Sequence, residues 1–213
     1  MGSNEDYELD SDYYGKEAGG SHGGESPKQQ SENMREGLAF SGLAIGFEAF
    51  LMVVYAALTT CIVDKEQAVS FDIYYNLFRD VNIMIFFGFG FLMTFLRRYA
   101  FSAVGYTFII SALVVQWSVI VQIVFEYIED EGYSKKQLDV TNLLEGLFCA
   151  GAVMISYGAV LGKVSPLQLL IMGIVEPVFY WTNNYLSLTY FEAVDIGGGY
   201  TIHMFGCYFG IAV

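Results

Sequence analysis

Residues 101–125 read FSAVGYTFIISALVVQWSVIVQIVF, a run of 25 residues without a single Asp, Glu, Lys or Arg. An α-helix rises ~1.5 Å per residue, so this run is roughly 37 Å long as a helix. That length exceeds the ~30 Å hydrocarbon core of a bilayer. The run therefore predicts a transmembrane helix.

Five further apolar runs lie on either side of this segment, separated by short polar breaks. They are residues 38–63, 81–96, 143–161, 167–188 and 199–213. Lipid cannot satisfy backbone polar groups, so a chain with several long apolar runs crosses a bilayer as helices. The sequence predicts an all-α polytopic membrane protein with about six transmembrane helices.

The last run is shorter than the others. As a helix, residues 199–213 would be only roughly 22 Å long, less than the ~30 Å core. A helix that ends inside lipid leaves carbonyl groups without partners. We therefore expect the chain to be a fragment of a longer protein.

Composition and charge exclude several other classes. Hydrophobic residues make up 54% of the chain and charged residues 15%, a balance that fits neither a disordered protein nor an ordinary soluble domain. The formal net charge of −13 argues against a nucleic-acid partner. Residues 1–36 hold nine acids and three bases, which predicts a disordered acidic tail ahead of a membrane domain at 37–213.

The sequence carries no pattern typical of an enzyme or a metal site. Its three cysteines lie far apart without a CxxC pair, and no serine stands in a GxSxG sequence. We therefore expect no catalytic residue, no cofactor and no metal.

Polar side chains within the apolar runs are the candidates for function, because a charge at the membrane centre costs at least ~2.5–3.5 kcal/mol. Asp195 stands where the last helix should begin, and a carboxylate there accepts the unpaired amide N–H groups of the first turn. His203 follows eight residues later, roughly 12 Å deeper and about 80° around an α-helix. Two plainer roles stay open: Asp195 as a simple cap, and His203 as a hydrogen-bond partner of another helix.

Three further residues are ambiguous from sequence. Phe148 is one of 18 phenylalanines and, taken alone, is a packing or lipid-facing side chain. Glu48 and Glu176 also lie in apolar runs; each is protonated, paired or close to a membrane surface. Pro177, next to Glu176, predicts a kink in the fifth helix.

Several motifs, in order along the chain, resemble one family. They are residues 78–95 (FRDVNIMIFFGFGFLMTF), 98–105 (RYAFSAVG), 116–117 (QW), 158–172 (GAVLGKVSPLQLLIM) and 201–210 (TIHMFGCYFG). From about Leu38 to Val213 the chain is similar to Rh glycoproteins of the Amt/Rh ammonium transporter family.

This resemblance implies a membrane channel or transporter for ammonium or ammonia, with carbon dioxide as a further candidate solute. It implies a homotrimer, or a heterotrimer with other Rh-family chains, in the lipid bilayer of the cell membrane. Each subunit would have its own pore through a bundle of eleven to twelve helices, of which this chain resembles the first half. The alternative is a non-conducting Rh-like subunit or truncated fragment that assembles with other Rh chains.

The resemblance also assigns roles to single residues. Asp195 matches an aspartate that organises the outer vestibule, His203 the first of two pore histidines, and Phe148 one of two phenylalanines that close the vestibule. The second histidine and phenylalanine would lie beyond Val213.

Two positions depart from the family pattern. Leu147 stands where the family commonly has Asp, and Asn184 where it has the acid thought to draw ammonium to the vestibule. Glu145 and Glu192 are then the expected sources of negative potential nearby.

Overall fold

The computed structural model describes residues 26–60, 65–96, 99–129 and 135–213. These residues are almost entirely helical, which confirms the all-α prediction. One short parallel bridge joins β1 (Thr59–Thr60) to β2 (Lys136–Gln137). The chain divides between Arg35 and Glu36 into two units, and the packing described below is that of Glu36–Val213.

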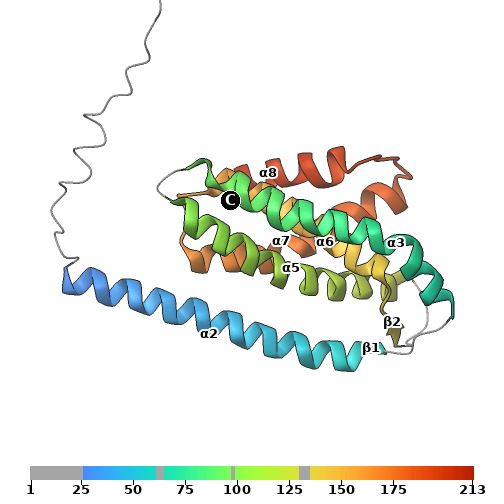
Figure 1. The fold of residues 1–213 in the computed structure, drawn as a ribbon, viewed down its shortest axis with the longest axis horizontal. Coiled ribbons are helices and arrows are strands. Elements are labelled where there is room, and N and C mark those ends of the chain that lie inside the picture. The colour runs from blue at the N-terminus through green and yellow to red at the C-terminus, as the bar shows by residue number, and fades with distance from the viewer. Residues whose placement is uncertain (1–25, 61–64, 97–98, 130–134) are drawn as a thin grey trace, which may run out of the picture. The chain divides into compact units, whose positions relative to one another are not determined.

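Helical structure occupies each of the six predicted runs (Figure 1). The elements are α2 (Pro27–Leu58), α3 (Lys65–Ile83), η1 (Met84–Phe89), α4 (Gly90–Leu92), η2 (Met93–Phe95), α5 (Ala100–Glu129), α6 (Val140–Val160), α7 (Pro166–Asn184), η4 (Tyr185–Tyr190), η5 (Gly199–Met204) and α8 (Phe205–Ala212). Three of them, η1, η4 and η5, are wide π-helical turns.

Among the described residues, four helices are long and apolar enough to cross a membrane. They are Lys28–Leu58, Phe71–Phe95, Ala100–Ile128 and Val140–Val160. The fifth and sixth runs are helical as well, but their crossing of the membrane stays a prediction.

The first helix begins earlier than expected. The prediction placed residues 27–36 in a disordered tail, whereas α2 starts at Pro27. Ser26 Oγ accepts the amide of Gln29 at 3.3 Å, and proline at the first helical position needs no amide partner. This local cap, and residues of good helix propensity such as Lys28, Gln29 and Gln30, extend the apolar helix towards the N-terminus. Residues 1–25, where the rest of the predicted tail lies, are outside the described residues.

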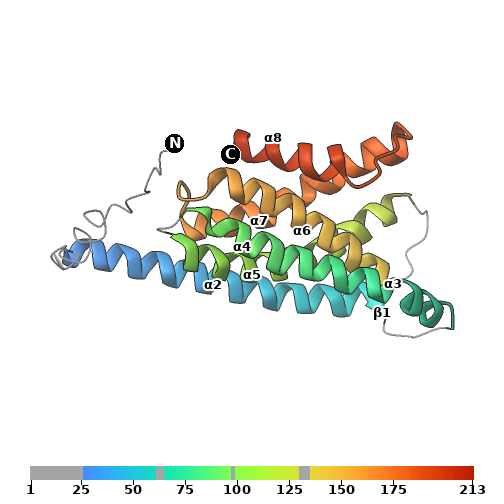
Figure 2. The same cartoon turned by 45° about the horizontal axis from the view of Figure 1, so that its top comes forward.

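Helix α6 forms the centre of the bundle. It packs against α3, α5, α7 and α8 (Figure 2). In its span 67% of the residues are buried, against 22% for Phe71–Phe95. Small residues such as Ala150 and Ala152 are fully buried there, which lets neighbouring helices approach closely.

Capping boxes fix where the two central helices begin. Asp139 and Asn142 exchange side-chain and backbone hydrogen bonds at the start of α6, and Ser165 and Gln168 do the same at the start of α7. Each box satisfies amide groups that a helix start otherwise leaves unpaired. The boxes and the intervening turn set how α6 and α7 enter the bundle.

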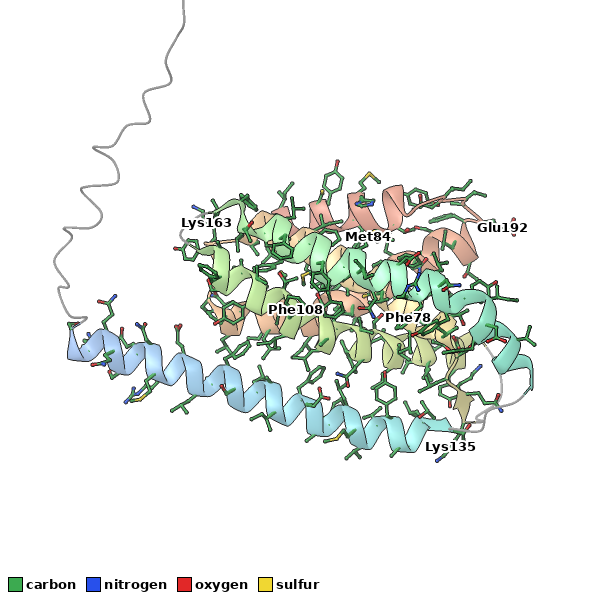
Figure 3. All side chains as sticks on the ribbon, in the orientation of Figure 1. Phe78, Met84, Phe108, Lys135, Lys163 and Glu192 are labelled. Atoms are coloured by element: carbon green, nitrogen blue, oxygen red, sulfur yellow. The ribbon has the colours of Figure 1, made fainter. Side chains whose placement is uncertain are left out.

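Charged residues mark the two ends of this bundle. Figure 3 shows Lys163 at one end and Glu192 at the other, with Met84 between them. A bundle with charges at its ends and apolar side chains between them matches the profile of a bilayer.

Candidate functional site

The carboxylate of Asp195 organises the start of η5. It accepts the backbone amides of Gly199 (2.8 Å), Tyr200 (3.2 Å) and Thr201 (2.9 Å), and also the Thr201 hydroxyl (2.7 Å). Desolvation acts to raise the pKa of Asp195, but these hydrogen bonds outweigh it and hold the pKa below its ordinary value of 3.8. The predicted helix-start role of this carboxylate agrees with this geometry.

The turn before η5 depends on two glycines with positive φ angles. Gly197 has φ 87° and Gly198 has φ 69°. A Cβ atom on Gly198 would lie 2.3 Å from Ile202 Cδ1. Only glycine fits this turn without strain, and the turn places Asp195 over the first amides of η5.

An apolar cavity of about 270 Å³ lies between α6, η5 and the segment that contains η1. Its lining consists of Met84, Ile85, Gly88, Phe89, Leu92, Phe148, Gly151, Gly197, Ile202 and His203. Apart from His203, the residues that line it are apolar or glycine. Phe148 and His203, which the sequence singled out separately, therefore line one cavity.

A second pocket of about 270 Å³ is more polar and lies next to the first. Its polar lining residues are Glu145, Tyr180, Asn184, Asp195 and Thr201. Phe148, Gly197 and Ile202 line both the polar pocket and the apolar cavity. Phe148 is thus part of the boundary between them, with Asp195 on the polar side and His203 on the apolar side.

The path from Asp195 to His203 differs from the expected α-helix. Both Ile202 N and His203 N donate to Gly198 O, at 3.1 and 3.0 Å, and the second bond is that of a π-turn. The rotation expected for a regular α-helix does not apply across this turn. The π-turn directly follows the two glycines with positive φ angles, and hydrophobic periodicity does not encode it.

Glu145, which lines the polar pocket, is hydrogen-bonded to a glutamine of the neighbouring helix α5. Gln122 Nε2 donates to Glu145 Oε2 at 2.6 Å, from α5 to α6. Glu145 was expected as a source of negative potential, and it lines the polar pocket together with Asn184. Glu192, the other expected source, does not line either pocket, and Leu147 is buried in the core.

No group of three His, Cys, Asp or Glu side chains suited to a metal ion occurs in the described part of the chain.

Together the helices define a multi-pass α-helical membrane protein. Residues 42–213 match the Ammonium Transporter Family, and the chain belongs to that family. The family resemblance predicted from the motifs is confirmed. Because this is a family of transporters and not of enzymes, the prediction that the chain is not an enzyme is confirmed as well.

Curated relatives place the chain in the Rh-type branch of the family. Rhesus-like glycoprotein B of Dictyostelium discoideum is 60% identical over 145 residues, which are 65% of this chain and 24% of that protein. Rhesus-like glycoprotein A of the same organism is 44% identical over 211 residues, or 90% of this chain and 40% of that protein. Ammonium transporter Rh type B of Danio rerio is 49% identical over 139 residues, or 65% of this chain and 30% of that protein. The chain spans between a quarter and two fifths of the length of these relatives.

Proposed function

We propose that this chain contributes part of a pore through which ammonia crosses the membrane, in the manner of an Rh-type ammonium transporter. The observation that carries the proposal is the position of Phe148. It lines both the polar pocket, which contains Asp195, and the apolar cavity, which contains His203.

The two environments suit a solute that changes charge on the way. Glu145 and Asp195 give the polar pocket negative potential, which attracts ammonium. Moving an ammonium-sized ion into a low-dielectric medium has an idealised cost of order 20 kcal/mol, so the apolar cavity favours the neutral form. Potassium has no proton to lose and is rejected by the same cavity.

Each named residue has a separate role in this proposal. Asp195 orders the mouth, since its oxygens already accept four hydrogen bonds from η5. Phe148 keeps bulk water out of the cavity. The imidazole of His203 donates or accepts a hydrogen bond as ammonia passes.

Location and assembly follow from the same proposal. We place the protein in the cell membrane, in a homotrimer or in a heterotrimer with other Rh-family chains. Carbon dioxide, which is small and uncharged, is a second solute that the apolar cavity suits.

A second candidate is that the chain is a non-conducting subunit that assembles with other Rh chains. His203 and its neighbour Met204 are exposed, so no described helix covers that side of the cavity. The chain also spans at most 40% of the relatives named above. A pore wall that is open on one side needs further helices before it conducts.

Methylammonium uptake tests both candidates. The chain is expressed alone and as a chimera that replaces the matching segment of Rhesus-like glycoprotein A, in cells without their own ammonium transporters. We expect the chimera to take up methylammonium and to lose uptake with His203→Ala or Asp195→Asn, whereas Met204→Ala is the neighbouring control. Uptake that neither variant changes contradicts the proposed roles.

The chain expressed alone separates the two candidates. Co-purification with a complete Rh protein, without uptake of its own, favours the non-conducting subunit. Uptake by the 213-residue chain reconstituted alone excludes it.

A further inference from the structure

A carboxyl group that lines neither pocket lies fully buried in the bundle. Glu176 of α7 is 0% exposed, and so is Ser156 of α6. Glu176 Oε1 lies 2.5 Å from Ser156 Oγ, and Ser156 Oγ lies 2.9 Å from the carbonyl oxygen of Gly206 in α8. Three helices therefore meet at one serine hydroxyl.

The hydroxyl cannot serve both neighbours if both are acceptors. A serine carries one O–H hydrogen, whereas an ionised carboxylate and a backbone carbonyl accept only. Both short contacts are satisfied when Glu176 is protonated, because its O–H then donates to Ser156 Oγ and Ser156 donates to Gly206 O.

Among the described residues, no cation is shown to pair with Glu176. The two ion pairs found among the described residues, Arg79–Asp80 and Lys136–Glu126, lie elsewhere. The other carboxyl oxygen, Oε2, has no hydrogen-bond partner within the described part of the chain. A buried unpaired carboxylate is far more costly than a buried neutral acid.

The third member of the contact belongs to the helix that follows His203. Gly206 lies three residues after His203, at the first turn of α8. The α8 backbone lies directly on α6: a Cβ atom on Gly206 would be 2.6 Å from Ala152 O, and one on Gly210 would be 2.8 Å from Ser156 Cα. The Ser156 bond thus acts at the closest approach of α6 and α8.

We propose that Glu176 is a neutral hydrogen-bond donor that, through Ser156, fixes the position of α8, the helix that directly follows the π-turn with His203. It is a positioning residue, since it lines neither pocket. Its effect on transport rests on the proposed function, but its protonated state does not.

Infrared spectroscopy of the purified 213-residue chain tests the protonated state. At neutral pH we expect a carboxylic-acid C=O band that Glu176→Gln removes and that Ser156→Ala shifts to higher frequency, because the acid loses its acceptor. Glu48→Gln is the control variant. It removes a carboxyl group from another helix, α2, where Gln116 is its partner, and should leave the band of Glu176 in place. If Glu176→Gln instead removes intensity from the ionised carboxylate band, or if Ser156→Ala leaves the acid band in place, the proposal is overturned.

Uptake by the chimera tests the positioning role. Glutamine has the shape of the neutral acid and still donates to Ser156, so we expect Glu176→Gln to keep uptake within about twofold of wild type. Glu176→Leu and Ser156→Ala, which break the chain of donors, should lower uptake about tenfold or more at equal surface expression. Equal loss in the Gln and Leu variants, or full uptake in the Leu variant, contradicts the positioning role. A wild-type chimera without uptake contradicts the proposed function alone, because the infrared bands still decide the state of Glu176.

Discussion

At the scale of single residues, the start of η5 depends on one carboxylate. Asp195 accepts three backbone amides and one hydroxyl, all from the six residues that follow it. No other side chain among the described residues is shown to accept the amides of Gly199, Tyr200 and Thr201. The mouth of the polar pocket is therefore sensitive to a change at this position.

Asp195→Ala should lower the free energy of unfolding by about 0.5–2 kcal/mol, the usual cost of losing a helix cap. The measurement is denaturant unfolding of the purified chain in detergent. Asp80→Ala is the control, because Asp80 is exposed and bonds only to Arg79, its neighbour in sequence, among the partners shown. A loss no larger than that of the control contradicts the capping role.

The stabilisation by Asp195 should also depend on pH. The pKa of Asp195 in the folded protein lies below its ordinary value of 3.8, so the folded state binds this proton less readily than the unfolded state. The contribution is complete above the ordinary value and is lost as pH falls through the lower, folded value. We expect the stability difference between wild type and Asp195→Asn to stay constant near neutral pH and to shrink below a pH of about 4. A difference that grows on acidification contradicts this assignment.

At the scale of helices, the contact between α6 and α8 controls where His203 lies. Backbone meets backbone there, because Gly206 and Gly210 have no side chains to separate the two helices. The neighbouring atoms are a carbonyl oxygen and a Cα atom, which cannot rotate away as a flexible side chain does. The position of α8 is therefore specified by its glycines as well as by Ser156.

Gly206→Ala should lower the free energy of unfolding by about 1–3 kcal/mol, because the added methyl group overpacks a rigid contact. Gly46→Ala in α2 is the matched control: nothing lies within 4 Å of its Cβ position, and the change removes a flexible residue from a helix. Denaturant unfolding in detergent should give a lower free energy of unfolding for Gly206→Ala than for wild type, and a higher one for Gly46→Ala. Equal stability of both variants contradicts the close approach of α6 and α8.

The sequence predicted some helices well and others only in outline. The run 101–125 corresponds to α5 and 143–161 to α6, because apolar runs of this length are typical of membrane-spanning helices. The π-turns at η1, η4 and η5 were not predicted. Hydrophobic periodicity indicates a helix but does not encode the extra residue per turn, which depends on contacts with other helices.

The candidate site was predicted in the same uneven way. Asp195 followed from its place before an apolar run and His203 from its place within that run, whereas Phe148 needed the family resemblance to stand out. Ile202, which lines both pockets, looked like one of many apolar residues. The Ser156–Glu176 contact was missed because the two residues are 20 positions apart on different helices.

At the scale of the whole molecule, the surface of the described chain is suited to contact with lipid. Large apolar side chains such as Phe87, Phe91 and Phe101 are exposed on its surface. In water this much exposed apolar area would drive aggregation, whereas acyl chains solvate it. The four candidate spans give the same indication independently of surface area.

We expect the expressed chain to stay in the membrane pellet after an alkaline carbonate wash, because several long apolar helices hold it there. The measurement is an immunoblot of pellet and supernatant, with a peripheral membrane protein as the control that the wash releases. Recovery of the chain in the supernatant contradicts the multi-pass arrangement.

The π-turn of η5 also makes the length of the segment between Asp195 and His203 important. The hydrogen bond from His203 N to Gly198 O spans five residues, one more than the bond of an α-helix. A one-codon deletion there would let the segment rewind as α-helix and swing the imidazole about 100° around the axis, away from Phe148. Insertions and deletions between Asp195 and His203 should therefore be far more harmful than substitutions at the same positions.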